Sequence, residues 1–147
     1  MVPSDGLSDE EIRSILKRAK VIMVIGASRD PYKASGAIPR YLISKGYCVV
    51  PVNPFASDID GVRALRSPSE YPGEERIDVI DVFRPSEEIP SLLESIRGLN
   101  FDVLWLQEGI YHPAVLQLNN KKLVWNRCIM KEHVRLFGSR KGQPGIR

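Results

Sequence analysis

The chain has 147 residues, 43% of them hydrophobic and 27% charged, and a formal net charge of +3 at pH 7. This length suits one domain with its own core, and the composition excludes a disordered chain. The weak positive charge suits an anionic small ligand, whereas Lys and Arg are too scattered for a nucleic-acid-binding stripe.

Cysteine content and hydropathy indicate the cellular compartment in which the protein is expected. Cys48 and Cys128 are too few for a disulfide framework, although a bond between these two stays open. No apolar run approaches the roughly 20 residues of a membrane span, and no apolar signal region stands at the beginning. We therefore expect a cytoplasmic protein that binds neither membranes nor nucleic acid.

The chain alternates helical and strand patterns. Ser8 and Glu11 have the spacing of a capping box, and apolar residues at helical spacing follow. After this first helix the patterns predict strand 21–25, helix 36–45, strand 47–52, strand 77–83, helix 86–97, strand 102–106, helix 113–119, strand 122–125 and a terminal helix over 129–136. Pro39 fits its helix if that helix begins near Ser35, because the first amides of a helix have no intrahelical partner.

Two segments lack a regular pattern. Residues 53–76 are rich in Pro, Ser and Gly, and we expect short helical turns there at 64–65 and 67–71. Residues 139–147 contain two glycines and a proline and are expected to form a flexible tail, which leaves 1–138 as the folded domain.

Alternating strands and helices predict the fold class. They indicate βαβ units with right-handed crossovers, hence a single Rossmann-like α/β domain with a parallel sheet of about five strands and helices on both faces. Such sheets bind ligands at the carboxyl ends of their strands, beside the point where the strand order reverses. The residues that follow each strand are therefore the candidates for function.

The first strand ends in Gly26-Ala27-Ser28. Gly26 can adopt backbone angles closed to other residues, and the small side chains of Ala27 and Ser28 would let a phosphate approach the backbone amides. The alternative is a plain tight turn between a strand and a helix. Within a parallel sheet we favour ligand binding.

The second strand ends in Asn53-Pro54. A domain that binds NAD usually has an acid about 20 residues after its glycine loop, where it accepts from the ribose hydroxyls. An uncharged Asn beside a proline suits contact with a base or with an amide of a pantetheine-like chain. It equally suits an Asn-Pro turn that leaves the strand.

Cations near these strand ends fit a heavily phosphorylated ligand. Arg29 and Lys33 lie in the turn after the first strand, and Arg84 follows the third. A guanidinium can bind a phosphate in a bidentate manner and a lysine acts as a point charge, although each cation alone is commonly a solvated surface residue. Ser86 suits both a helix N-cap and a ligand contact.

A series of short motifs follows the predicted order of strands and turns. The series comprises Ile25-Gly26-Ala27-Ser28, Lys33, Tyr41-Leu42, Gly46-Tyr47, Pro51-Val52-Asn53-Pro54, Asp81-Val82-Phe83-Arg84, Leu104-Trp105-Leu106-Gln107, Gly109 and Asn126-Arg127-Cys128. Over roughly residues 8 to 137 the chain resembles stand-alone coenzyme A (CoA)-binding domain proteins. These are similar to the CoA-binding domains of the succinyl-CoA synthetase alpha subunit and of nucleotide-diphosphate-forming acyl-CoA synthetases.

The resemblance implies a role for each matched strand end. The residues it assigns to the CoA phosphates are Gly26, Ala27, Ser28 and Lys33. It places the nucleotide between Asn53 and Pro54, the adenosine or its phosphate beside Phe83 and Arg84, and the pantetheine chain along Gln107 and Gly109. Fold likeness alone does not carry function, and a chain of this length has no room for the other domains of a synthetase.

Three functions stay open. We favour binding of CoA or an acyl-CoA by a protein without catalysis of its own, such as a carrier, sensor or accessory protein. A rival is a small enzyme acting on the CoA thiol or an acyl-CoA through Cys128, and another is an interaction protein that binds a different nucleotide or none. A homo-oligomer or a synthetase-like partner subunit is compatible with the first. His112 and His133 have no partner at zinc-ligand spacing, so no metal is expected.

Overall fold

Five parallel strands form the central sheet in the order β2-β1-β5-β6-β7. The computed structural model describes residues 1–138 of the chain. The strands are β1 (Val21–Ile25), β2 (Cys48–Val52), β5 (Arg76–Val82), β6 (Asn100–Leu106) and β7 (Lys122–Val124). The strand order reverses between β1 and β5, which places the switch point of this Rossmann-like sheet there.

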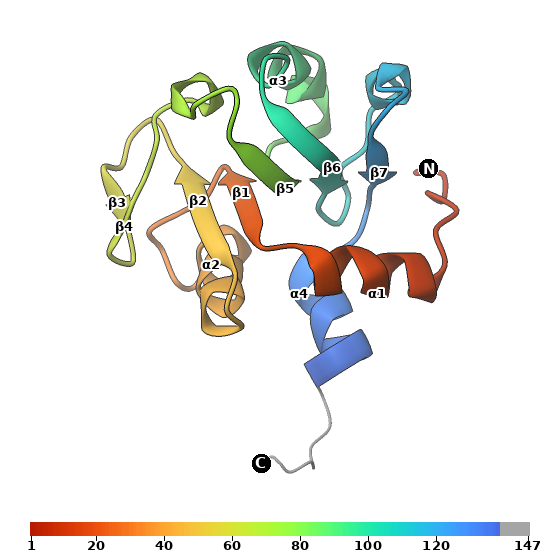
Figure 1. Ribbon diagram of the computed structural model, residues 1–147, viewed down its shortest axis with the longest axis horizontal. Coiled ribbons are helices and arrows are strands. Elements are labelled where there is room, and N and C mark those ends of the chain that lie inside the picture. Colours follow the sequence, from red (N-terminus) through yellow and green to blue (C-terminus); the bar gives the residue numbers. More distant parts are fainter. Residues whose placement is uncertain (139–147) are drawn as a thin grey trace.

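Helices cover both faces of the sheet, as expected. One face carries α1 (Asp9–Arg18), α2 (Ala34–Ser44) and α4 (Ile129–His133), and the other carries α3 (Ile89–Ser95) and the 3-10 helix η3 (Pro113–Gln117) (Figure 1). A π-helical turn, η4 (Val134–Gly138), continues α4. Each face has its own apolar core, with Trp105 fully buried in the first and Ile80 in the second. Within residues 1–138, no helix is long and apolar enough to cross a membrane.

The first helix forms as its sequence predicts. The Ser8 hydroxyl accepts from the Glu11 amide at 3.1 Å, and the Glu11 carboxylate accepts from the Ser8 amide at 3.0 Å. Ile12 and Leu16 lie one turn apart on one side of α1 and are both buried against the sheet. The capping box and the amphipathic pattern are therefore both confirmed.

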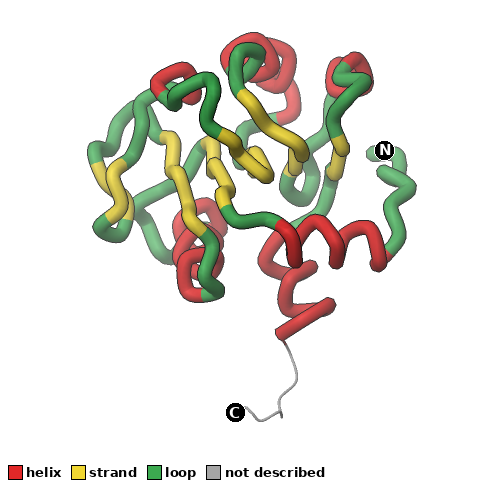
Figure 2. The backbone as a smooth tube through the Cα atoms, viewed as in Figure 1, coloured by secondary structure: helices red, strands yellow, loops and turns green. Residues whose placement is uncertain are grey.

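The segment between β2 and β5 differs from the expectation. A small hairpin forms from β3 (Asp58–Ile59) and β4 (Val62–Arg63), with positive φ at Asp60 and Gly61 (Figure 2). Asp-Gly is a strong signal for such a turn, and the sequence analysis missed it. The expected helical turn at 64–65 is wrong, because Leu65 is extended and exchanges backbone hydrogen bonds with the end of β2. The expected turn near 67–71 is confirmed as the 3-10 helix η1 (Pro68–Glu70).

The helices of the second half are shorter than expected. The segment expected as helix 86–97 divides into the 3-10 helix η2 (Ser86–Glu88) and α3. Pro90, in the first turn of α3, has no amide to donate to the Ser86 carbonyl, so a continuous α-helix cannot form there. The helix expected over 113–119 is the 3-10 helix η3. The expected tail, 139–147, lies outside the described residues.

Candidate functional site

A cavity of about 590 Å³ opens at the carboxyl ends of β1, β2 and β5, on both sides of the switch point. Eight of the residues singled out from the sequence line it: Gly26, Ala27, Ser28, Lys33, Asn53, Pro54, Phe83 and Arg84. Four others do not line it: Arg29, Ser86, Gln107 and Gly109. The structure thus brings together the ends of the first three strands of the sheet in chain order.

Gly26 holds the turn after β1 against both neighbouring strands. Its φ is +90°, and a Cβ atom there would lie 3.1 Å from the Phe83 carbonyl oxygen and from Cδ of Arg84. Its amide donates to the Val52 carbonyl at 3.0 Å. Both the backbone angle and the close approach of the strand end after β5 therefore require glycine.

Asn53 fastens this glycine loop to the end of β2. Its side-chain amide donates to the Ala27 carbonyl at 2.8 Å, and its Oδ1 accepts from the Phe55 amide at 2.7 Å. A carboxylate could not donate to the carbonyl, so these contacts explain why an amide stands where an NAD-binding domain has an acid. The Asn-Pro turn foreseen as one alternative is present, and it is tied to the loop.

The start of α2 is shaped by a proline and a glycine. Pro39 has no amide to donate to the Ser35 carbonyl, and that carbonyl accepts from the Ser28 amide at 2.9 Å instead. A Cβ atom on Gly36 would overlap the Asp30 carbonyl, so the turn after the glycine loop packs directly on α2. Sequence reasoning missed Gly36, although a glycine in the first turn of a helix was a signal for a close backbone approach.

The charged residues of the cavity include one that the sequence analysis missed. Arg66 lines it beside Lys33 and Arg84, because Leu65 bonds to the end of β2 and brings the next residue back to the sheet. A carboxylate, Glu88, also lines the cavity and pairs with Arg84. The Arg84 guanidinium beside it lowers the pKa of the Glu88 carboxyl, so the pair is charged at neutral pH. Three cations and one carboxylate thus line the cavity, so its lining carries an excess of positive charge.

An exposed aromatic ring and a polar helix face complete the cavity. Phe55, directly after the Asn53-Pro54 turn, is 95% exposed. The helix α3 contributes Ser91, Leu92 and Ser95 to the lining. The Ser91 hydroxyl donates to the carbonyl of Glu88, the N-cap of α3, and the Ser95 hydroxyl donates to the carbonyl of Leu92, which leaves their oxygen lone pairs as acceptors.

Ser86 and Gly109 join a second group of loops, after β5, β6 and β7. The Ser86 hydroxyl accepts from the Tyr111 amide at 3.0 Å and donates to the Gly109 carbonyl at 3.4 Å. The Gly109 amide in turn donates to Oδ1 of Asn126 at 2.7 Å. Ser86 is therefore not the N-cap of a helix, a position that Pro85 takes. Its hydroxyl ties two loops together.

Gln107 points into the protein rather than to the surface. Its amide donates to Oδ1 of Asp81, and its oxygen accepts from the Ile129 amide at 3.4 Å. Asp81 is fully buried, and its Oδ2 has no hydrogen-bond partner within residues 1–138. Burial raises the pKa of Asp81 to about 7. The side chain of Gln107 therefore organises the interior beneath the strand ends.

Cys128 lies apart from the cavity. It is 6% exposed at the N-cap of α4, where its sulfur accepts from the Lys131 amide at 3.4 Å. The neighbouring Arg127 forms ion pairs with Asp5 and Glu132. Cys48 and Cys128 are both free, so the disulfide that the sequence left open is absent. Among residues 1–138, no group of three His, Cys, Asp or Glu side chains is placed to hold a metal ion.

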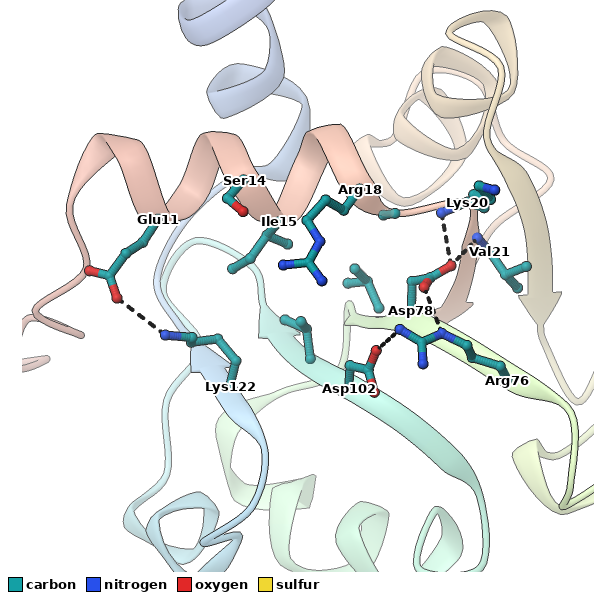
Figure 3. A pocket seen from close by; sticks show the side chains of 13 residues that line it. Glu11, Ser14, Ile15, Arg18, Lys20, Val21, Arg76, Asp78, Asp102 and Lys122 are labelled. Atoms are coloured by element: carbon teal, nitrogen blue, oxygen red, sulfur yellow. Dashed lines mark hydrogen bonds and ion pairs between the residues drawn. The ribbon is translucent and has the colours of Figure 1, made fainter.

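A larger cavity, of about 770 Å³, lies at the opposite, amino edge of the sheet, below α1 (Figure 3). Its carboxylates already have partners: Glu11 pairs with Lys122, Asp102 pairs with Arg76, and Asp78 accepts from the amides of Lys20 and Val21. Among the residues that the structure describes, no glycine lines it, and parallel sheets bind ligands at their carboxyl edge. We therefore take the smaller cavity as the candidate site.

Known proteins resemble this chain over most of its length. A family model described as "CoA binding domain" matches residues 20–134. The uncharacterized protein YneT of Bacillus subtilis is 33% identical over 129 residues, which cover 86% of this chain and 94% of that protein. A solved structure of a hypothetical protein from Pyrococcus horikoshii is 34% identical, with a TM-score of 0.83, covering 94% of this chain and 98% of that one.

One larger protein shares the fold. The dinucleotide-forming acetyl-coenzyme A synthetase 1 of Ca. Korarchaeum cryptofilum is 24% identical and superposes with a TM-score of 0.56. The match covers 80% of this chain and 23% of the synthetase. At this identity the likeness is one of fold.

Proposed function

Because this chain belongs to the CoA-binding domain family, we propose that it binds coenzyme A or an acyl-CoA in the cavity at the carboxyl ends of β1, β2 and β5. In this proposal the protein is a carrier, sensor or accessory protein without catalysis of its own. The observation that carries it is the convergence of a glycine turn, a helix start and three cations on one cavity.

The diphosphate of CoA suits the start of α2. Lys33 is the N-cap of α2 and makes no side-chain capping bond, and within residues 1–138 no hydrogen bond is found from the amides of Ala34 and Ser35. Such donors and the positive end of the helix dipole favour a phosphate. The side chains of Lys33 and Arg66 also line the cavity and would add positive charge there.

The nucleotide base suits the wall built by the end of β2. Phe55 offers an exposed ring, and Pro54 fixes the backbone before it. Aromatic faces stack on bases without regard to sequence, at about 1–3 kcal/mol per base. NAD is disfavoured because Asn53, at the position of the usual acid, is committed to the glycine loop.

The lining also favours binding without catalysis. Among residues 1–138, neither Cys nor His lines the cavity, and these are the usual nucleophile and base of enzymes that act on thioesters. Cys128 is buried at the start of α4 and does not line this cavity. The rival proposal of an enzyme that uses Cys128 therefore loses its geometric support.

Calorimetry tests the ligand. The purified chain is titrated with CoA, acetyl-CoA, NAD and ATP under the same buffer and salt. We expect CoA or acetyl-CoA to bind more tightly than NAD and ATP. Tightest binding of NAD would contradict the role assigned to Asn53, and binding of none of the four would leave only an interaction protein.

A matched pair of variants tests the site. Arg66 lines the cavity, whereas Arg63 is exposed on β4 and does not. A hydrogen bond to a charged group contributes about 1.5–3 kcal/mol, so Arg66→Ala should weaken CoA binding about tenfold or more. Arg63→Ala removes the same charge and should leave the affinity within about twofold. Equal losses in the two variants would mean that only the net charge matters.

A further inference from the structure

Arg84 already holds an anion that belongs to the protein. Its Nε donates to Oε1 of Glu88 at 3.0 Å and its Nη2 donates to Oε2 at 2.9 Å. These two parallel bonds are the arrangement in which a guanidinium binds a phosphate. Both side chains line the cavity, and each is 46% exposed. The carboxylate therefore takes the donors that a ligand phosphate would use.

The backbone keeps Arg84 at this position. Cδ of Arg84 lies 3.1 Å from where a Cβ of Gly26 would be, so the stem of the side chain rests on the glycine turn. Glu88 is the last residue of η2 and the N-cap of α3, and its side chain makes no capping bond but reaches back to Arg84. The guanidinium can change partners by rotating about its own bonds while its stem stays in place.

We infer that Glu88 is an affinity-determining residue, which competes with the phosphates of the ligand for the guanidinium of Arg84. This inference rests on the proposed function of the same cavity. Binding would move Arg84 from the carboxylate to a phosphate and leave Glu88 as a free negative charge beside the ligand. Glu88 would thus lower the affinity for phosphorylated ligands.

The expected effect is modest. Exposed ion pairs are weak, and the charge of Glu88 acts on the ligand through solvent and salt. Removing the charge should therefore tighten CoA binding about two- to fivefold at low salt. The gain should shrink as the ionic strength rises, because screening weakens both the ion pair and the repulsion.

Neighbouring glutamates provide the test. Glu88→Gln removes the competing charge, and Glu87→Gln makes the same charge change one residue away, at an exposed side chain outside the cavity lining. CoA affinity is measured by calorimetry for the wild type and both variants at two salt concentrations. A thermal melt of each variant checks that it is folded.

The inference predicts tighter binding by Glu88→Gln and no change beyond the error in Glu87→Gln. It is overturned if Glu88→Gln binds CoA as tightly as the wild type or more weakly, since the carboxylate would then not compete with the ligand for Arg84. Equal gains in both variants would also overturn it, because they would reflect net charge. Failure of the proposed function is a separate result, namely no CoA binding by the wild type.

Discussion

At the scale of single residues, several polar side chains at the strand ends form hydrogen bonds within the protein. Asn53 bridges the glycine loop to the turn after β2, and Ser86 bridges two loops. Gln107 contacts a buried carboxyl. The residue types that suggest ligand contact in a sequence are therefore also those that satisfy backbone groups near a site.

Asp81 makes a testable contribution at this scale. Burial raises the pKa of its carboxyl to about 7 from an ordinary value of 3.8. Between about pH 4 and pH 7, Asp81 is therefore protonated in the native state and ionised in the unfolded state. The free energy of unfolding falls as the pH rises through this window, because the native carboxyl must then lose its proton in a buried site. For one such group, the free energy of unfolding cannot fall by more than about 1.4 kcal/mol per pH unit.

The variant Asp81→Asn has no such proton to lose. We expect the free energy of unfolding of the wild type, minus that of the variant, to fall between pH 5 and pH 8. Urea unfolding at several pH values measures this difference, in which the titration of all other groups cancels. A difference that stays constant with pH would mean that Asp81 is ionised in the native state throughout.

The sequence predicted the residues that depend on local pattern. The glycine turn after an apolar strand, the capping box and the parallel sheet follow from periodicity and from the types of residue at strand ends. Arg66 could not be predicted as a cavity residue, because its place depends on the return of Leu65 to β2. The pairing of Arg84 with Glu88 likewise depends on the direction in which η2 follows the end of β5.

At the scale of elements, the start of α2 is the segment on which the site depends. Gly36 lets the turn at Asp30 pack on the helix, and Pro39 frees the Ser35 carbonyl for the Ser28 amide. Pro39 is an oddity in the sequence alone. In the structure it is the reason that the glycine turn and α2 share a hydrogen bond.

Replacing Gly36 tests this element. A methyl group in Gly36→Ala would overlap the Asp30 carbonyl, and relieving such overpacking costs about 1–3 kcal/mol. We expect a lower free energy of unfolding by about that amount, measured in urea. Gly98→Ala is the control, because a Cβ atom there meets nothing within 4 Å. Equal effects of the two substitutions would contradict the close contact.

At the scale of the whole molecule, the amino and carboxyl edges of the sheet differ in what they contain. The N-terminal segment lies beside β7 (Figure 1), and its Asp5 accepts from the amide of Trp125, directly after that strand, and pairs with Arg127. At the amino edge, Arg76 pairs with Asp102 of β6, and Glu11 of α1 pairs with Lys122 of β7 (Figure 3). The carboxyl edge keeps the cavity with the excess of cations.

The claim that the carboxyl edge binds CoA is tested most directly by nuclear magnetic resonance. Isotope-labelled protein is titrated with CoA while its assigned backbone amide signals are followed. We predict that the largest shifts fall in residues 26–36, 53–55, 66–68 and 83–88. Shifts concentrated around Glu11, Arg18 and Asp102, at the larger cavity of the amino edge, would contradict the account.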